Sequence, residues 1–61
     1  MFEQLTGDVR NYAVVLMNRS IKELEIQLER GRKLRYWGLT IDETKIALRA
    51  AISEKQKMAI S

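Results

Sequence analysis

The sequence predicts an all-α protein in the form of a helical hairpin. Three observations support this prediction. The chain contains no proline and only three glycines in 61 residues, so a helix can run far without interruption. Apolar residues recur at alternating spacings of three and four, the period of one helix face. A helix-ending glycine, Gly38, is followed closely by a helix-starting threonine, Thr40, which predicts a tight corner between two helices.

The first helix is expected to begin at Asp8, a good N-cap residue, and to run to about Arg35. Gly31 lies on the apolar stripe of this helix without contributing a side chain. The polar face carries two pairs of opposite charges with i,i+4 spacing, Arg19 with Glu23 and Glu29 with Lys33. The stripe consists of Val14, Met17, Ile21, Leu24 and Leu28.

An alternative reading breaks this helix at Ser20. Ser20 and Glu23 have the spacing of a capping box, the pattern that starts a helix. Residues 12–17 would then form a separate short helix, or a strand, because Val14 and Val15 are β-branched. We favour one continuous helix, because the apolar stripe crosses Ser20 without losing its phase.

The corner is expected at Gly38, which can adopt the left-handed conformation that closes a helix. Leu39 would then contact Leu34, as often happens at such a closure. Thr40 and Glu43 form a second capping-box pattern, in which each side chain can bond to the other residue's amide.

The second helix is expected over residues 41–59. Leu48 and Ile52 lie on its apolar face, and alanines beside them allow close helix packing. Asp42 and Glu43 lie in the first turn and Lys57 near the end, where each charge favours the helix dipole. The whole chain is therefore expected to form one domain, residues 1–61.

A hairpin folded at Gly38 would leave the N-terminal part of its long first helix uncovered. Bare apolar surface of that kind marks an interface. So short a chain, with no cysteine for disulfides, also gains little stability from its own core. We therefore expect a homodimer in which two hairpins form a four-helix arrangement. The expected interface residues are Val9, Tyr12, Ala13, Leu16 and Met17.

A dense cluster of cations lies where the first helix is expected to end. Arginines neutralise phosphates, and an aromatic ring can stack on an unpaired base. The net charge of +3 permits this use without requiring it. Cations are also favoured in the last turns of a helix for structural reasons alone. The residues expected to contact nucleic acid, should it bind, are Arg30, Arg32, Lys33, Arg35 and Trp37.

Catalytic and metal chemistry have little support in this sequence. Histidine and cysteine are absent, which removes the usual general base, the usual thiol nucleophile and the commonest zinc ligands. Ser20 and Ser53 have no candidate base beside them, so neither is expected to act as a nucleophile. Among the glutamates of the first helix that could act as metal ligands, only Glu25 and Glu29 share a face. We therefore expect a protein that is not an enzyme and that uses no cofactor or metal. The longest apolar run, residues 12–17, is too short to span a membrane.

Two resemblances bear on function. The order of a β-prone segment at residues 12–17, a helix from Ser20 and a Gly38-Leu39-Thr40 turn before a second helix resembles ribbon-helix-helix repressors. This resemblance implies a small dimeric regulator of transcription that binds nucleic acid. Its ribbon, however, needs alternate polar side chains to read bases, and residues 12–17 offer almost none.

The second resemblance is one of type. A very short, basic chain without cysteine or proline is similar to the accessory proteins of lambdoid bacteriophage early regions. It implies a regulator in the host-cell cytoplasm that binds a host or phage protein. We therefore expect a non-enzymatic regulator that acts as a homodimer through protein–protein contact, with a nucleic-acid-binding regulator as the alternative.

Overall fold

The computed structural model describes residues 2–33 and 37–60 of the chain and places three helices in them. These are α1 (Gly7–Leu16), α2 (Ile21–Arg30) and α3 (Ile41–Ile60). No strand occurs in these two ranges, so the predicted all-α fold is confirmed. The predicted second helix corresponds to α3, which extends one residue beyond its expected end.

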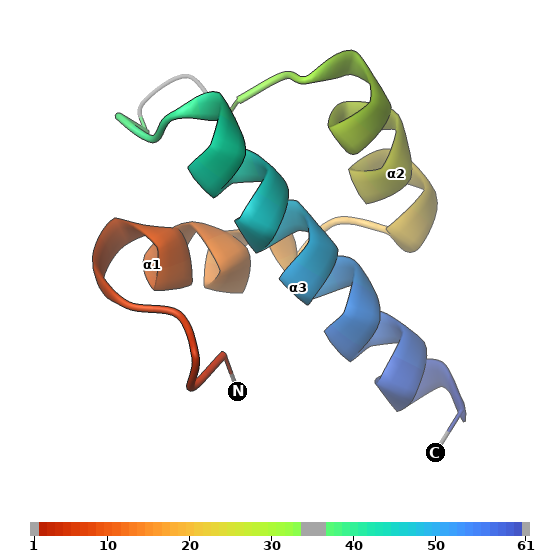
Figure 1. Ribbon diagram of the computed structural model, residues 1–61. Coiled ribbons are helices and arrows are strands. Elements are labelled where there is room, and N and C mark those ends of the chain that lie inside the picture. Colours follow the sequence, from red (N-terminus) through yellow and green to blue (C-terminus); the bar gives the residue numbers. More distant parts are fainter. Residues whose placement is uncertain (1, 34–36, 61) are drawn as a thin grey trace.

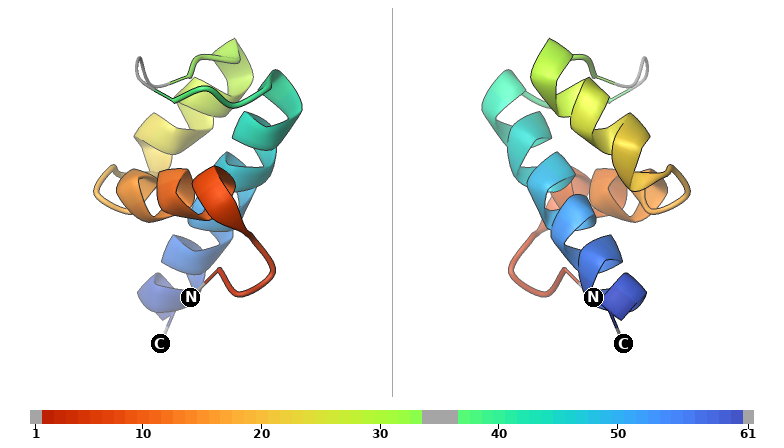
Figure 2. Two further views of the ribbon diagram at one scale, coloured as in Figure 1. Left: turned by 90° about the vertical axis from the view of Figure 1, so that its left-hand side faces the viewer. Right: turned by 90° about the vertical axis from the view of Figure 1, so that its right-hand side faces the viewer.

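Helix α3 packs against both of the shorter helices, which lie on the same side of it (Figures 1 and 2). The core fills the space between the three helices. Leu24 of α2 and Leu48 of α3 are completely buried there, as the apolar stripes predict. Buried residues of the core are Phe2, Leu5, Tyr12, Ala13, Leu16, Leu24, Leu39, Ala47, Leu48 and Ala51.

The prediction of one continuous first helix is wrong, because the chain turns between α1 and α2. The amides of Asn18 and Arg19 donate to the carbonyls of Val15 and Leu16, which tightens the end of α1. Ser20 then takes an extended conformation, and its hydroxyl accepts a hydrogen bond from the Glu23 amide at 3.2 Å. The capping signal therefore prevails over the continuity of the apolar stripe.

This break agrees with the alternative of a separate short helix and rules out the strand. Residues 12–16 are helical, so the ribbon that the ribbon-helix-helix resemblance requires is not present. Helix α1 begins at Gly7, with Thr6 rather than Asp8 in the N-cap position. Asp8 lies instead in the first turn, where its negative charge favours the helix dipole.

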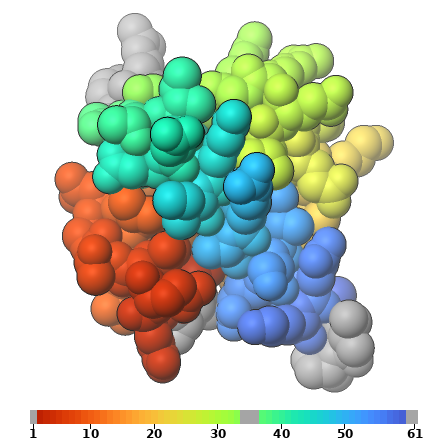
Figure 3. Space-filling view, in the orientation of Figure 1, coloured from red at the N-terminus to blue at the C-terminus, as the bar shows by residue number. Residues whose placement is uncertain are grey.

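The segment before α1 folds back and closes one side of the core. Phe2 and Leu5 are buried, and the Leu5 amide donates to the Phe2 carbonyl at 3.1 Å. On the molecular surface this segment lies beside the C-terminal half of α3 (Figure 3). The sequence pattern gave no indication of this cover, because two apolar residues in a short non-helical segment have no period.

Because α1 is a separate helix and not the start of a long one, the predicted dimer interface is also corrected. Tyr12, Ala13 and Leu16 are completely buried within one chain, and Val9 and Met17 are partly buried against the same core. Because the chain turns after α1, α3 packs across this helix and covers Tyr12, Ala13 and Leu16, while Val14 of the predicted stripe stays 49% exposed. These three buried residues are therefore not available to a second chain in this fold.

A glycine does close the helix before the corner, but it is Gly31 and not Gly38. Gly31 has a left-handed backbone with φ of 69°, and its amide and the next one donate to the carbonyls of Leu28 and Gln27. Gly38 is not in the left-handed region. Helix α2 consequently ends at Arg30, and the predicted contact between Leu39 and Leu34 lies outside the described residues.

Replacing Gly31 by alanine is expected to destabilise the fold by about 1–2 kcal/mol, because an L-residue is strained at positive φ. No atom lies within 4 Å of where the added Cβ would stand, so the cost is conformational and not steric. Gly38→Ala is the matched control and should change the melting temperature little, because Gly38 has neither positive φ nor close neighbours. Thermal unfolding followed by circular dichroism compares the two. Equal effects would contradict the assignment of Gly31 as the helix-closing residue.

The capping box at the start of α3 is confirmed in both directions. The Glu43 amide donates to Thr40 Oγ1 at 3.1 Å, and the Thr40 amide donates to Glu43 Oε1 at 3.0 Å. Two hydrogen bonds hold the pKa of the Glu43 carboxyl below its ordinary value of 4.5. The larger effect comes from the backbone amide of Thr40, and the smaller from the Thr40 side chain. The charged form of Glu43 is therefore the one that the folded state favours.

This lowered pKa predicts a pH dependence of stability with a definite sign. The contribution of Glu43 is fully present above its unfolded pKa near 4.5 and is lost as the pH falls through the lower, folded pKa. Glu43→Gln should therefore remove part of the acid sensitivity, while Glu25→Gln on the exposed side of α2 serves as the control. Melting temperatures measured between about pH 6 and pH 3 test this. A Glu43→Gln protein with the same loss of stability in acid as the wild type would refute it.

Candidate functional site

An open cleft of about 370 Å³ lies along the solvent-facing side of α2. We call it the basic cleft, because, among the described residues that line it, four side chains are cationic and one is acidic. Helix α2 contributes most of it, and the residues just after Gly31 close one end. The lining residues are Arg19, Glu23, Ile26, Gln27, Arg30, Arg32 and Lys33.

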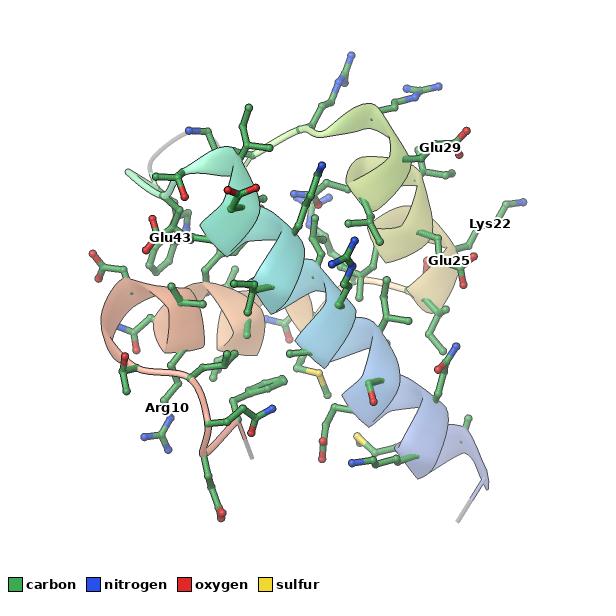
Figure 4. All side chains as sticks on the ribbon, viewed as in Figure 1. Arg10, Lys22, Glu25, Glu29 and Glu43 are labelled. Atoms are coloured by element: carbon green, nitrogen blue, oxygen red, sulfur yellow. The ribbon has the colours of Figure 1, made fainter. Side chains whose placement is uncertain are left out.

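The position of these side chains follows from helix geometry. Glu23, Ile26 and Arg30 are separated by three and four residues, so they lie on one face of α2. The left-handed turn at Gly31 redirects the chain, and Arg32 and Lys33 consequently line the same cleft. Lys22, Glu25 and Glu29 project from the side of α2 that points away from α3 (Figure 4).

Gln27 forms the inner wall of the cleft and connects it to the core. Its Nε2 atom donates to the Tyr12 hydroxyl at 2.5 Å and to the Arg32 carbonyl at 2.9 Å. The first bond joins α2 to α1, and the second fixes the main chain after Gly31. The bond to Tyr12 is buried and the bond to Arg32 is partly buried, and together they hold the cleft in a defined shape.

The positive charges of the basic cleft are only partly neutralised. Arg19 lies 4.0 Å from the Glu23 carboxylate, an exposed pair that stabilises little. Lys33 Nζ donates to the Leu39 carbonyl at 2.6 Å instead of pairing with Glu29 as predicted. Within the described ranges, Arg30 and Arg32 make no ion pair. Two guanidinium groups therefore remain available for an anionic group from outside the chain.

The cleft also contains an exposed apolar side chain. Ile26 is 41% exposed, although it lies near the middle of α2 between Glu23 and Arg30. An isolated exposed isoleucine is ordinary on a protein surface. Here it lies among charged side chains in a concave site, the arrangement of an interface with an apolar centre and a charged rim.

The structure brings together three of the five residues predicted to contact nucleic acid, Arg30, Arg32 and Lys33. Arg35 lies outside the described residues. Trp37 is not part of the cleft, because its ring packs edge-on against Tyr12 with 5.6 Å between ring centroids. It therefore supports the core rather than offering a free ring for a base.

Sequence reasoning missed the role of Arg19, Ile26 and Gln27 at this site. The spacing of Arg19, Glu23, Ile26 and Arg30 carries this signal, but the predicted polar face includes only Arg19 and Glu23 of these four residues. A second cleft, lined by Ile21, Lys55, Met58 and Ala59, lies between α2 and α3. Lys55 Nζ donates there to the Met17 carbonyl at 3.0 Å, which places a cation at the end of α1.

Comparisons of the chain with protein-family models, with curated proteins and with solved structures gave no match. None of the helices in the described ranges has the length and apolar character needed to cross a membrane. Those ranges also contain no group of three potential metal ligands among their acidic residues.

Proposed function

We propose that this protein is a small, non-enzymatic regulator that acts by binding another protein through the basic cleft. The observation that carries this proposal is the exposed Ile26 next to Arg30 and Arg32, which form no ion pair with any other residue that the structure describes. An apolar side chain gains from burial against a partner, and charged neighbours select which partner can approach. The resemblance to phage accessory proteins is consistent with a cytoplasmic host or phage protein as the partner.

Nucleic acid is the alternative ligand, and the grouping of Arg30, Arg32 and Lys33 favours it. Three features weigh against it. Glu23 lies inside the cleft, where its carboxylate would repel a phosphate. Trp37 is engaged with the core and does not accompany the cations. Ile26 adds nothing to phosphate binding, whereas it gives a protein partner an apolar contact.

The test is photo-crosslinking in the cells that carry the gene, with the photoreactive residue p-benzoylphenylalanine placed at position 26. We expect covalent adducts with one other protein, identified by mass spectrometry. The same residue placed at position 53, which is exposed on α3 outside the cleft, is the control and should not give that adduct. Adducts with nucleic acid alone, or the same protein at both positions, would contradict the proposal.

We also propose that the protein self-associates, although not through the residues first expected. The remaining support is its size, because a 61-residue core without disulfides has little stability to spare. Val14 of α1 and Ile46 and Met58 of α3 are each about half exposed and offer apolar surface for a second copy. Sedimentation equilibrium at micromolar concentration should give twice the chain mass. A stable monomer under these conditions would refute self-association without affecting the proposed role of the cleft.

A further inference from the structure

We infer that the partner presents an acidic amphipathic helix, which lies along α2 with its acidic side chains at Arg30 and Arg32. This inference rests on the proposed function and adds the chemistry and shape of the partner.

The shape of the site suits a helix. The ten residues of α2 extend for about 15 Å, close to three turns. Along this length Glu23, Ile26 and Arg30 follow one another at the three-and-four spacing by which two packed helices meet. An apolar side chain of a partner helix can therefore contact Ile26, while residues a turn away reach the charged positions on either side.

The distribution of charge determines which partner fits. At the end of the cleft formed by Arg30, Arg32 and Lys33 there is an excess of positive charge, and the acid of the cleft, Glu23, is on the far side of Ile26. Partner carboxylates at the cationic end would form charge-assisted hydrogen bonds with guanidinium groups that have no ion pair within the described ranges. Near Glu23 the same carboxylates would be repelled, so the cleft favours acids at one end only.

The site is also organised before a partner arrives. Gln27 holds the Arg32 main chain, and Lys33 is held by the Leu39 carbonyl. The backbone that carries the arginines therefore does not need to be ordered on binding, which lowers the entropic cost. A partner helix therefore binds this site more tightly than it would bind the same side chains on a mobile loop.

The test is a titration of the ¹⁵N-labelled protein with a synthetic helical peptide of about five turns. The peptide carries leucines on one face and glutamates at one end of it. Amide shifts should concentrate at residues 19–33 and saturate below millimolar peptide. Two matched peptides are the controls: one with each glutamate replaced by glutamine, and one with each leucine replaced by serine. Both should bind at least about tenfold more weakly.

Protein variants locate the binding site. Arg30→Glu/Arg32→Glu should weaken peptide binding at least about tenfold. Ile26→Ser should also weaken peptide binding, although it leaves the net charge of the protein unchanged. Arg10→Glu/Lys57→Glu changes net charge equally on exposed residues outside the cleft and should leave binding unchanged. Far-ultraviolet circular dichroism confirms that each variant is folded. Binding that disappears in a folded Arg30→Glu/Arg32→Glu protein and persists in the other double variant supports the inference.

Four results would overturn it: no shifts at millimolar peptide, shifts centred outside residues 19–33, equal binding of the glutamine peptide, or tighter binding of an oligonucleotide of the same charge. The crosslinking experiment separates this inference from the proposed function. Protein adducts at position 26 together with no binding of the acidic peptide would leave the function standing and refute the acidic helix. Peptide binding without protein adducts would refute the function.

Discussion

Tyr12→Ala is expected to cost about 3–5 kcal/mol and to lower the melting temperature by at least about 12 °C. Tyr12 is completely buried, its hydroxyl accepts a hydrogen bond from Gln27, and its ring contacts Trp37. Removing it would leave a cavity between α1 and α3. A chain of 61 residues has a total stability of only about 3–9 kcal/mol, so much of the variant should be unfolded at room temperature.

Tyr12→Phe is the control for this prediction. It keeps the ring in the core and removes only the hydroxyl, so it should cost about 1–3 kcal/mol. In each variant the melting temperature should depend on protein concentration no more steeply than it does in the wild type, because Tyr12 is buried within one chain. A concentration dependence that is much steeper in Tyr12→Ala than in the wild type would place Tyr12 at a subunit interface and contradict the fold described here.

Leu24→Ala is expected to cost about 2–5 kcal/mol, because Leu24 is completely buried between α2 and α3. Ile26→Ala, two residues along the same helix, should change stability by less than about 0.5 kcal/mol, since its side chain faces the open cleft. Urea unfolding of both variants gives the two free energies. Comparable losses would mean that Ile26 also belongs to the core, and the basic cleft would then be misplaced.

The parts of the fold that the sequence predicted were those with a local physical cause. The capping box of Thr40 and Glu43 depends on two residues three apart, and it forms as expected. The extent of α3 follows from an uninterrupted stretch of good helix formers. The break at Ser20 is harder to predict, because the apolar stripe continues across it in phase. Periodicity alone does not distinguish one helix from two.

The position of the helix end was missed for a related reason. Gly31 and Gly38 are both able to adopt positive φ, and only Gly38 has a helix-starting pattern directly after it. In the structure Gly31 ends α2 at Arg30, before the predicted end at about Arg35. This places Arg32 and Lys33 in the same cleft as Arg30. The candidate site was therefore half predicted: the cations were recognised, while Ile26 and Gln27 could be assigned only after the helix position was known.

The edge-on packing of Trp37 against Tyr12 gives the protein a built-in optical probe. Trp37 is the only tryptophan in the chain, so its fluorescence comes from one known place. The Tyr12 hydroxyl is bonded to Gln27, and Gln27 also lines the basic cleft. A helix docked on that cleft would therefore disturb the surroundings of the indole through a chain of two contacts. Emission from the unlabelled protein should register both unfolding and occupation of the cleft, so each variant can be assayed without attaching a dye.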